Sequence, residues 1–120
     1  MKRELKDRLK AKYPTVFGVA TGWEVGDGWH EILDALGAQL SRLKQIAVLT
    51  EIREKHGFLD LSYRSASVEA EALINAASDA SERVCELCSE PGMIDPAASW
   101  LRTRCTTCRA MDRPAVGGVH

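Results

Sequence analysis

In several segments of the first two thirds of the chain, apolar residues recur at the spacing of a helix. Leu5 and Leu9 lie four positions apart within the charged segment 1–12, which predicts a short amphipathic helix. Another helix is expected over residues 28–44, with Asp27 as its N-cap. The apolar stripe of this helix consists of Ile32, Leu33, Leu36, Leu40 and Leu43.

After this helix, the spacing of apolar residues changes to that of a β-strand. Residues 46–54 and 58–63 alternate, with a turn at residues 55–57 between them, which together predict an antiparallel β-hairpin. A further helix is expected over residues 67–83, with Ser67 as its cap. The first strand should place Ile46, Val48, Thr50 and Ile52 on one face, and Ala47, Leu49, Glu51 and Arg53 on the other.

Residues 13–29 show neither period and combine glycines with aromatic residues. Pro14 should end the first helix, and the glycines permit tight turns. Because aromatic rings bury large areas, this segment is expected to be an irregular loop packed against the core. The alternative is that it presents Trp23 and Trp29 to a partner.

Composition and charge narrow the class of protein. The chain has 120 residues, which suits one domain, and a net charge of -1 at pH 7. Nucleic-acid binding would therefore need a local basic patch, and it is not favoured. No apolar run is long enough to span a membrane, and the charged N-terminus holds no secretory signal. A cytoplasmic protein is expected, with its cysteines as thiols or metal ligands.

Four cysteines carry the clearest chemistry in the sequence. Cys85, Cys88, Cys105 and Cys108 form two C-x-x-C pairs separated by sixteen residues, a spacing typical of zinc sites. Each pair can direct two sulfur atoms at one ion, and two pairs complete a tetrahedron. Four thiolates leave no ligand position for water, so the predicted Zn²⁺ is structural rather than catalytic. Two disulfides, a redox dithiol and an iron–sulfur cluster are the alternatives.

The predicted fold class is α+β, in which helices pack on the antiparallel hairpin and a zinc module follows. The expected divisions are an α+β core at 1–84, the zinc-binding module at 85–112 and a flexible tail at 113–120. A strand including Trp100 and Thr103 and a short helix over residues 105–112 are expected, as in treble-clef modules. A zinc ribbon remains the alternative.

Other residue types offer less. Acidic and basic residues nearly balance in the module once four thiolates bind zinc. Arg102, Arg104 and Arg109 are therefore expected to neutralise the thiolates rather than bind phosphates. The histidines, His30, His56 and His120, lack the spacing of a metal site, and no nucleophile or phosphate-loop motif is present. The charged residues of segment 51–55 are most simply a solvated strand end, so no enzyme activity is expected.

Several of these features together resemble a group of small bacteriophage and prophage proteins. The matching features are residues 26–29 (Gly-Asp-Gly-Trp), the turn at 53–57, the segment 81–88 from the alanine-rich helix to the first cysteine pair, and the segment 100–108 with its tryptophan before the second pair. His56 stands where the group has phenylalanine, and Asp60 stands where a basic residue is common. The resemblance implies a viral origin and zinc binding, but no shared activity.

The expected function is therefore non-enzymatic binding to a protein in a host or phage complex, with a partner in the bacterial host. Inhibition of a bacterial defence system such as CRISPR-Cas is one concrete form of this function, by analogy alone. The alternative is a zinc-dependent nucleic-acid-binding regulator. The binding surface is expected on elements that the zinc holds in place, such as the loop around Trp23 and Trp29 or the hairpin near His56.

Overall fold

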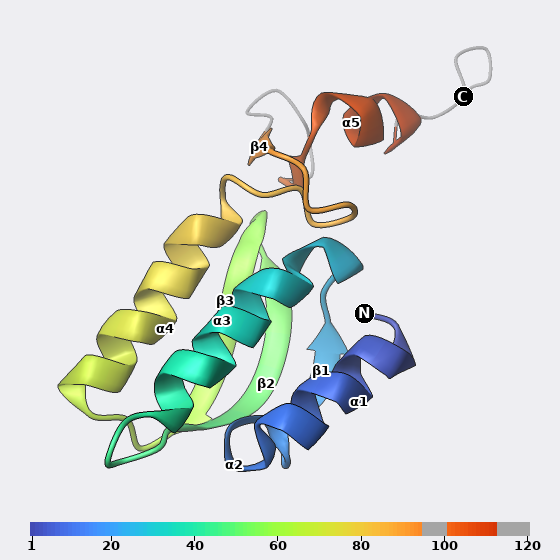
Figure 1. Cartoon of the computed structure of the whole chain (residues 1–120). Helices are drawn as coiled ribbons and strands as arrows, with labels where there is room; N and C mark the ends of the chain where they lie inside the picture. Colours follow the sequence, from blue (N-terminus) through green and yellow to red (C-terminus); the bar gives the residue numbers. More distant parts are fainter. Residues whose placement is uncertain (95–100, 113–120) are drawn as a thin grey trace.

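The computed structural model describes residues 1–94 and 101–112 (Figure 1). The helices are α1 (Arg3–Lys12), α2 (Pro14–Phe17), α3 (His30–Ser41), α4 (Val68–Ser81) and α5 (Thr106–Asp112), with a short 3₁₀ helix, η1 (Asp27–Trp29), before α3. The strands are β1 (Thr21–Glu24), β2 (Val48–Lys55), β3 (Phe58–Arg64), β4 (Met93–Ile94) and β5 (Thr103–Arg104). The expected flexible tail, 113–120, and the expected strand position of Trp100 lie outside the described residues.

The mixed helix and strand content agrees with the expectation, and the predicted hairpin is present. Strands β2 and β3 pair antiparallel, and Lys55 opposes Phe58 across a two-residue turn. Both turn residues have positive φ, 53° at His56 and 89° at Gly57. This is the backbone that a tight hairpin turn requires, and glycine adopts it without strain.

The hairpin also has a feature that simple alternation did not predict. Leu49 and Ile52 are both buried, although three positions separate them and they were assigned to opposite faces. The register shifts between Leu49, which opposes Tyr63, and Glu51, which opposes Ser62. Thr50 is therefore an extra residue in β2, and such a bulge reverses the face of every side chain after it. The single-face assignment of residues 46–52 was wrong for this reason.

The segment 13–29 is more regular than expected. Pro14 follows the end of α1 and occupies the first turn of α2, where its missing N–H costs nothing. Strand β1 then pairs parallel with β2 and extends the hairpin to a three-stranded sheet in the order β1-β2-β3. The expectation of an irregular loop was therefore wrong. Packing was expected, and Phe17 and Trp29 are buried while Trp23 is half-buried against Phe17.

The helix boundaries follow local chemistry. Ser67 caps α4 as predicted, since its Oγ accepts a hydrogen bond from the Ala70 N–H at 3.1 Å. Asp27, in contrast, does not cap α3. It lies in η1, and its Oδ1 accepts a bond from the Lys2 backbone N–H at 2.7 Å.

Helices α3 and α4 lie beside each other across the sheet formed by β2 and β3 (Figure 1). The hydrophobic core lies between these layers and is completed by α1 and α2. Among the described residues, no helix is long and apolar enough to cross a membrane. The buried members of the core are Leu9, Val16, Phe17, Ala20, Val25, Trp29, Leu33, Leu36, Leu40, Ala47, Leu49, Ile52, Leu59, Ala70, Ile74 and Ala77.

Candidate metal centre

The four cysteines come together at the end of α4. Cys85 and Cys88 lie in the turn that follows the helix, whereas Cys105 lies between β5 and α5 and Cys108 within α5. The four Sγ atoms all lie within 4.8 Å of one another. This clustering is the arrangement required for four thiolates around one metal ion.

The same geometry does not contain a disulfide. All four cysteines are free, and the Sγ atoms of Cys88 and Cys105 are 3.6 Å apart. A disulfide bond would bring two sulfur atoms to about 2.05 Å. The alternative of paired disulfides is therefore not what the fold presents.

Backbone hydrogen bonds shape both cysteine turns. The Ser89 N–H donates to the Cys85 carbonyl at 3.0 Å, and Ser89 has a positive φ of 72°. In the second turn, the Cys108 N–H donates to the Cys105 Sγ at 3.3 Å, and the Arg109 N–H donates to the Cys105 carbonyl at 2.9 Å. Such turns direct two sulfur atoms inward, and N–H donors to sulfur stabilise a thiolate.

The acidity of the thiols is consistent with this environment. Burial raises the pKa of Cys85, but the backbone N–H groups of Cys105, Cys88 and Leu87 together lower it to about 7. The neighbouring thiols of Cys105 and Cys88 raise the pKa of Cys108 to about 12. Close like charges oppose ionisation, so four thiolates can coexist here only around a cation.

The sulfur donor set therefore fits a metal ion. No family model, curated protein or solved structure matches this chain. The candidate site rests on its own geometry.

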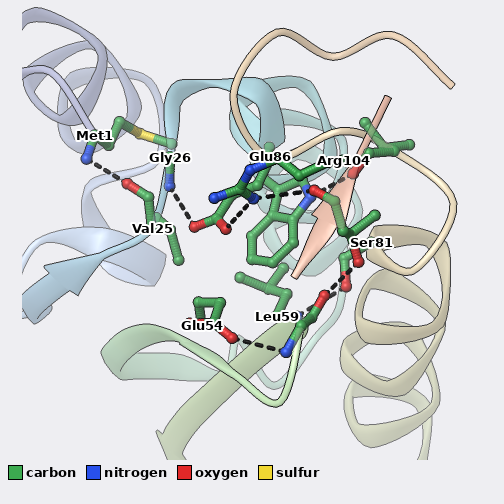
Figure 2. Close-up of polar contacts among 12 residues, drawn as sticks. Met1, Val25, Gly26, Glu54, Leu59, Ser81, Glu86 and Arg104 are labelled. Atoms are coloured by element: carbon green, nitrogen blue, oxygen red, sulfur yellow. Dashed lines mark hydrogen bonds and ion pairs between the residues drawn. The ribbon is translucent and has the colours of Figure 1, made fainter. Parts of the chain in front are cut away.

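Glu86 connects this site to the rest of the protein. It lies between Cys85 and Cys88, and its Oε2 accepts a hydrogen bond from the Gly26 N–H at 2.9 Å (Figure 2). Its Oε1 accepts one from Arg104 Nη1 at 3.1 Å, and both side chains of this ion pair are buried. Its backbone carbonyl accepts a further bond from the Gly28 N–H at 2.6 Å.

Two glycines make this close contact possible. A Cβ atom on Gly26 would lie 2.3 Å from the Glu86 carbonyl oxygen, and one on Gly28 would lie 2.1 Å from the Cys85 carbonyl oxygen. These are backbone atoms, which cannot rotate away as a side chain can. Trp29 adds a hydrogen bond from its Nε1 to the Val84 carbonyl at 2.9 Å. The first cysteine turn therefore packs closely against the segment 26–29.

The hairpin tip forms a second contact with the metal-site region. The Thr103 hydroxyl donates a hydrogen bond to the Gly57 carbonyl, and both partners are buried. A Cβ on Gly57 would lie 3.2 Å from the Ile94 side chain, so β4 also approaches the tip. Of the elements expected to be held by the metal module, the segment 26–29 and the hairpin tip contact it, whereas Trp23 packs against Phe17.

The remaining candidates have other roles. Arg104 forms its ion pair with Glu86, and Arg109 donates to the Met93 carbonyl at 3.0 Å, so both also make contacts that were not foreseen. His56 is exposed in the hairpin turn, as predicted. His30 is half-buried, and among the described residues its Nε2 has no hydrogen-bond partner. His120 lies outside the described residues.

The charged cluster at the hairpin is held by ion pairs. Arg53 lies 3.3 Å from Asp60 and 3.7 Å from Glu51, and these side chains are partly exposed. Glu54 accepts a hydrogen bond from the Gly57 N–H at 2.7 Å. These contacts agree with the interpretation of a solvated, mutually neutralised strand end.

Sequence reasoning missed the role of Glu86. A glutamate between two cysteine ligands looks solvated when only composition is considered. The available signal was the pair of glycines around Asp27, because glycines next to a tryptophan indicate close backbone approach. Nothing in the sequence indicated which segment approaches them.

Proposed function

We propose that the four cysteines bind one structural Zn²⁺ ion. Thiolate ligands in two C-x-x-C turns favour zinc over harder cations such as Mg²⁺ or Ca²⁺. All four ligand positions of a tetrahedral ion are then filled by protein. The ion replaces an apolar core in a segment whose buried side chains are mainly cysteine, glutamate, threonine and arginine.

The order of elements supports a treble-clef-like module over a zinc ribbon. A cysteine turn is followed by the short antiparallel pair β4 and β5 and then by α5, which contains Cys108. In a treble clef, a helix supplies part of the second ligand pair, whereas a ribbon uses two hairpin turns. A helix at this position therefore favours the former.

We further propose that the protein acts without catalysis, by binding a protein partner. The observation that favours this function is the exposure of Leu87, Met93 and Leu101 on a small module with a polar interior. Their exposed fractions are 45%, 61% and 37%. Exposed apolar residues often mark protein interaction sites, whereas a closed thiolate shell offers no site for Lewis-acid chemistry.

Because several sequence features resemble those of phage proteins, we propose that the partner is a protein in the cytoplasm of a bacterial host. Inhibition of a defence complex such as CRISPR-Cas is the specific form that we propose by analogy. The test is affinity capture from host lysate with the zinc-loaded protein, identified by mass spectrometry. The double variant Leu87→Ser/Met93→Ser serves as the matched bait, which is the control for the wild-type protein.

A protein enriched by the wild-type bait and lost with the matched bait is the expected result. Capture of no protein, or equal capture by both baits, would contradict the proposal. Elemental analysis of the matched bait must show unchanged zinc, because both changed side chains are exposed and neither is a metal ligand.

A nucleic-acid-binding regulator is a second candidate, favoured by one observation. Residues 2–12 hold six basic side chains against two acidic ones, so α1 is basic although the chain is not. Arg3 and Arg8 on this helix are exposed. A gel shift at low salt, weakened by added salt and by Arg3→Ala/Arg8→Ala, is the expected result for this candidate. No shift at low salt would exclude it.

A further inference from the structure

Glu86 and Arg104 each stand next to a predicted metal ligand. Glu86 follows Cys85, and Arg104 precedes Cys105. Their ion pair, at 3.1 Å, therefore joins the two cysteine turns, and Glu86 contacts Gly26 at the same time (Figure 2). The Glu86 N–H also donates to the Thr103 carbonyl at 3.1 Å. Any ion that holds the two turns together also holds these partners together.

The pair is costly unless its geometry is maintained. Both residues have only 8% of their surface exposed. A buried charge is tolerated when it is paired and hydrogen-bonded, and separation of the partners leaves each charge desolvated or forces it into water. If the cysteine turns separate, the Glu86 carboxylate loses Arg104 and becomes more stable in water, which weakens its bond with the Gly26 N–H.

The hydrophobic core meets this arrangement through Trp29, which belongs both to the core and to the segment 26–29. Its buried members extend along the chain from Leu9 to Ala77 and include none of the cysteines. The links between the metal module and the segment 26–29 are polar contacts: the two glycine N–H groups and the Ser89 hydroxyl, which donates to the Gly28 carbonyl at 2.7 Å. Polar links can open without exposure of the apolar core.

We infer that Glu86 is a positioning residue that makes the conformation of residues 26–29 depend on metal occupancy. With the ion bound, Glu86 holds Gly26 and Gly28 against the first cysteine turn. Without the ion, the contacts of Gly26 and Gly28 with this turn open while the core remains folded. The first cysteine turn also carries the exposed residue Leu87. Metal occupancy therefore determines both the position of Leu87 and the contacts that support this turn. The inference rests on the proposed metal site.

Amide hydrogen exchange of the full chain, read by NMR, tests this directly. The samples are the zinc-loaded protein and the same protein after chelation, with zinc measured in each. The reporters are the Gly26 and Gly28 amides, whose acceptors belong to Glu86. The control is the amide of Phe17 at the end of α2. It donates at 3.0 Å to the carbonyl of Tyr13, the residue between α1 and α2.

The expected result is exchange about tenfold faster or more at both glycines after chelation, with little change at Phe17. Equal protection at the glycines with and without zinc would overturn the inference but leave the zinc site intact. Loss of protection at Phe17 as well would show global unfolding, and would also overturn it. A purified protein without bound zinc would contradict both proposals.

A substitution separates positioning from metal binding. Glu86→Gln retains the size of the side chain but removes its charge, so the ion pair between residues 86 and 104 is lost. We expect one zinc ion per chain as in the wild type, yet faster exchange at Gly26 and Gly28 even in the zinc-loaded protein. The matched control is Leu87→Ala in the same turn, an exposed residue that should change neither. Wild-type protection in zinc-loaded Glu86→Gln would contradict the role assigned to Glu86.

Discussion

Residues 1–84 and residues 85–112 are stabilised by different means. The first region buries leucines, aromatic rings and branched side chains between two helices and a sheet. In the described part of the second region, the buried residues are Cys85, Glu86, Thr103, Arg104 and Cys105. A region this small and polar buries little apolar area, which is the reason for proposing that a metal ion stabilises it.

The contrast predicts that each region responds to a different perturbation. Apolar burial is sensitive to lost volume, whereas a metal-held turn is sensitive to a lost ligand. The contacts between the regions are polar and depend on close backbone approach. A substitution in one region should therefore affect the other region through these contacts.

The largest effect is expected for loss of a buried ligand. Cys105→Ser should abolish zinc binding and unfold the module, because the binding free energy of such sites, about 10–16 kcal/mol in small zinc peptides, is also their folding free energy. Elemental analysis and circular dichroism measure the two effects. Thr107→Ser, an exposed position in the same turn, is the control. Retention of one zinc ion by Cys105→Ser would argue against the assigned ligand.

A core truncation should produce the opposite pattern. Leu36→Ala removes a buried side chain of α3 and should lower the free energy of unfolding by about 2–5 kcal/mol. Zinc content of the folded protein should be unchanged, since Leu36 belongs to the first region. Leu36→Met, which conserves volume, should cost less than about 1.5 kcal/mol. Zinc loss at temperatures where Leu36→Ala remains folded would remove the distinction between the regions.

A substitution in the contact itself should affect both regions. Gly28→Ala places a Cβ 2.1 Å from the Cys85 carbonyl oxygen, a contact that only backbone movement can relieve. We expect a cost of about 1–3 kcal/mol in the free energy of unfolding and weaker zinc retention against a chelator. Gly22→Ala is a useful comparison, because its Cβ has ordinary space and only its φ of 61° is unfavourable. Equal zinc retention in both variants would contradict the close docking.

The smallest effect is expected at the hairpin tip. Thr103→Val removes the hydroxyl that donates to the Gly57 carbonyl while conserving shape. The expected loss is about 1 kcal/mol in the free energy of unfolding, measured by denaturant titration, since a buried acceptor loses its partner. Thr107→Val, at an exposed position, should be neutral. No difference between the two would show that the tip is not tied to the module.

Local patterns predicted the parts of the structure that local chemistry determines. The helices, the hairpin, the Ser67 cap and the clustering of cysteines follow from spacing within a short stretch of chain. Strand β1 could not be predicted in this way, because Gly22 interrupts a four-residue segment that depends on parallel pairing with β2, far along the chain. The Thr50 bulge is likewise a property of two paired strands rather than of one.

The candidate site shows the same division. The clustering of the four cysteines was predictable because two C-x-x-C turns at this spacing are typical of one metal site. The docking of Glu86 on Gly26 was not, since the two residues are separated by sixty positions. The pairing of Arg104 with Glu86 was missed because the charge count led to the expectation that Arg104 neutralises the thiolates.

The most direct test of the central claim is the X-ray absorption fine structure of the purified, zinc-loaded protein. A structural site formed by Cys85, Cys88, Cys105 and Cys108 predicts four sulfur neighbours at about 2.3 Å from zinc, with no nitrogen or oxygen ligand. A first shell that contains nitrogen or oxygen, or a protein that binds no zinc under reducing conditions, would contradict the account.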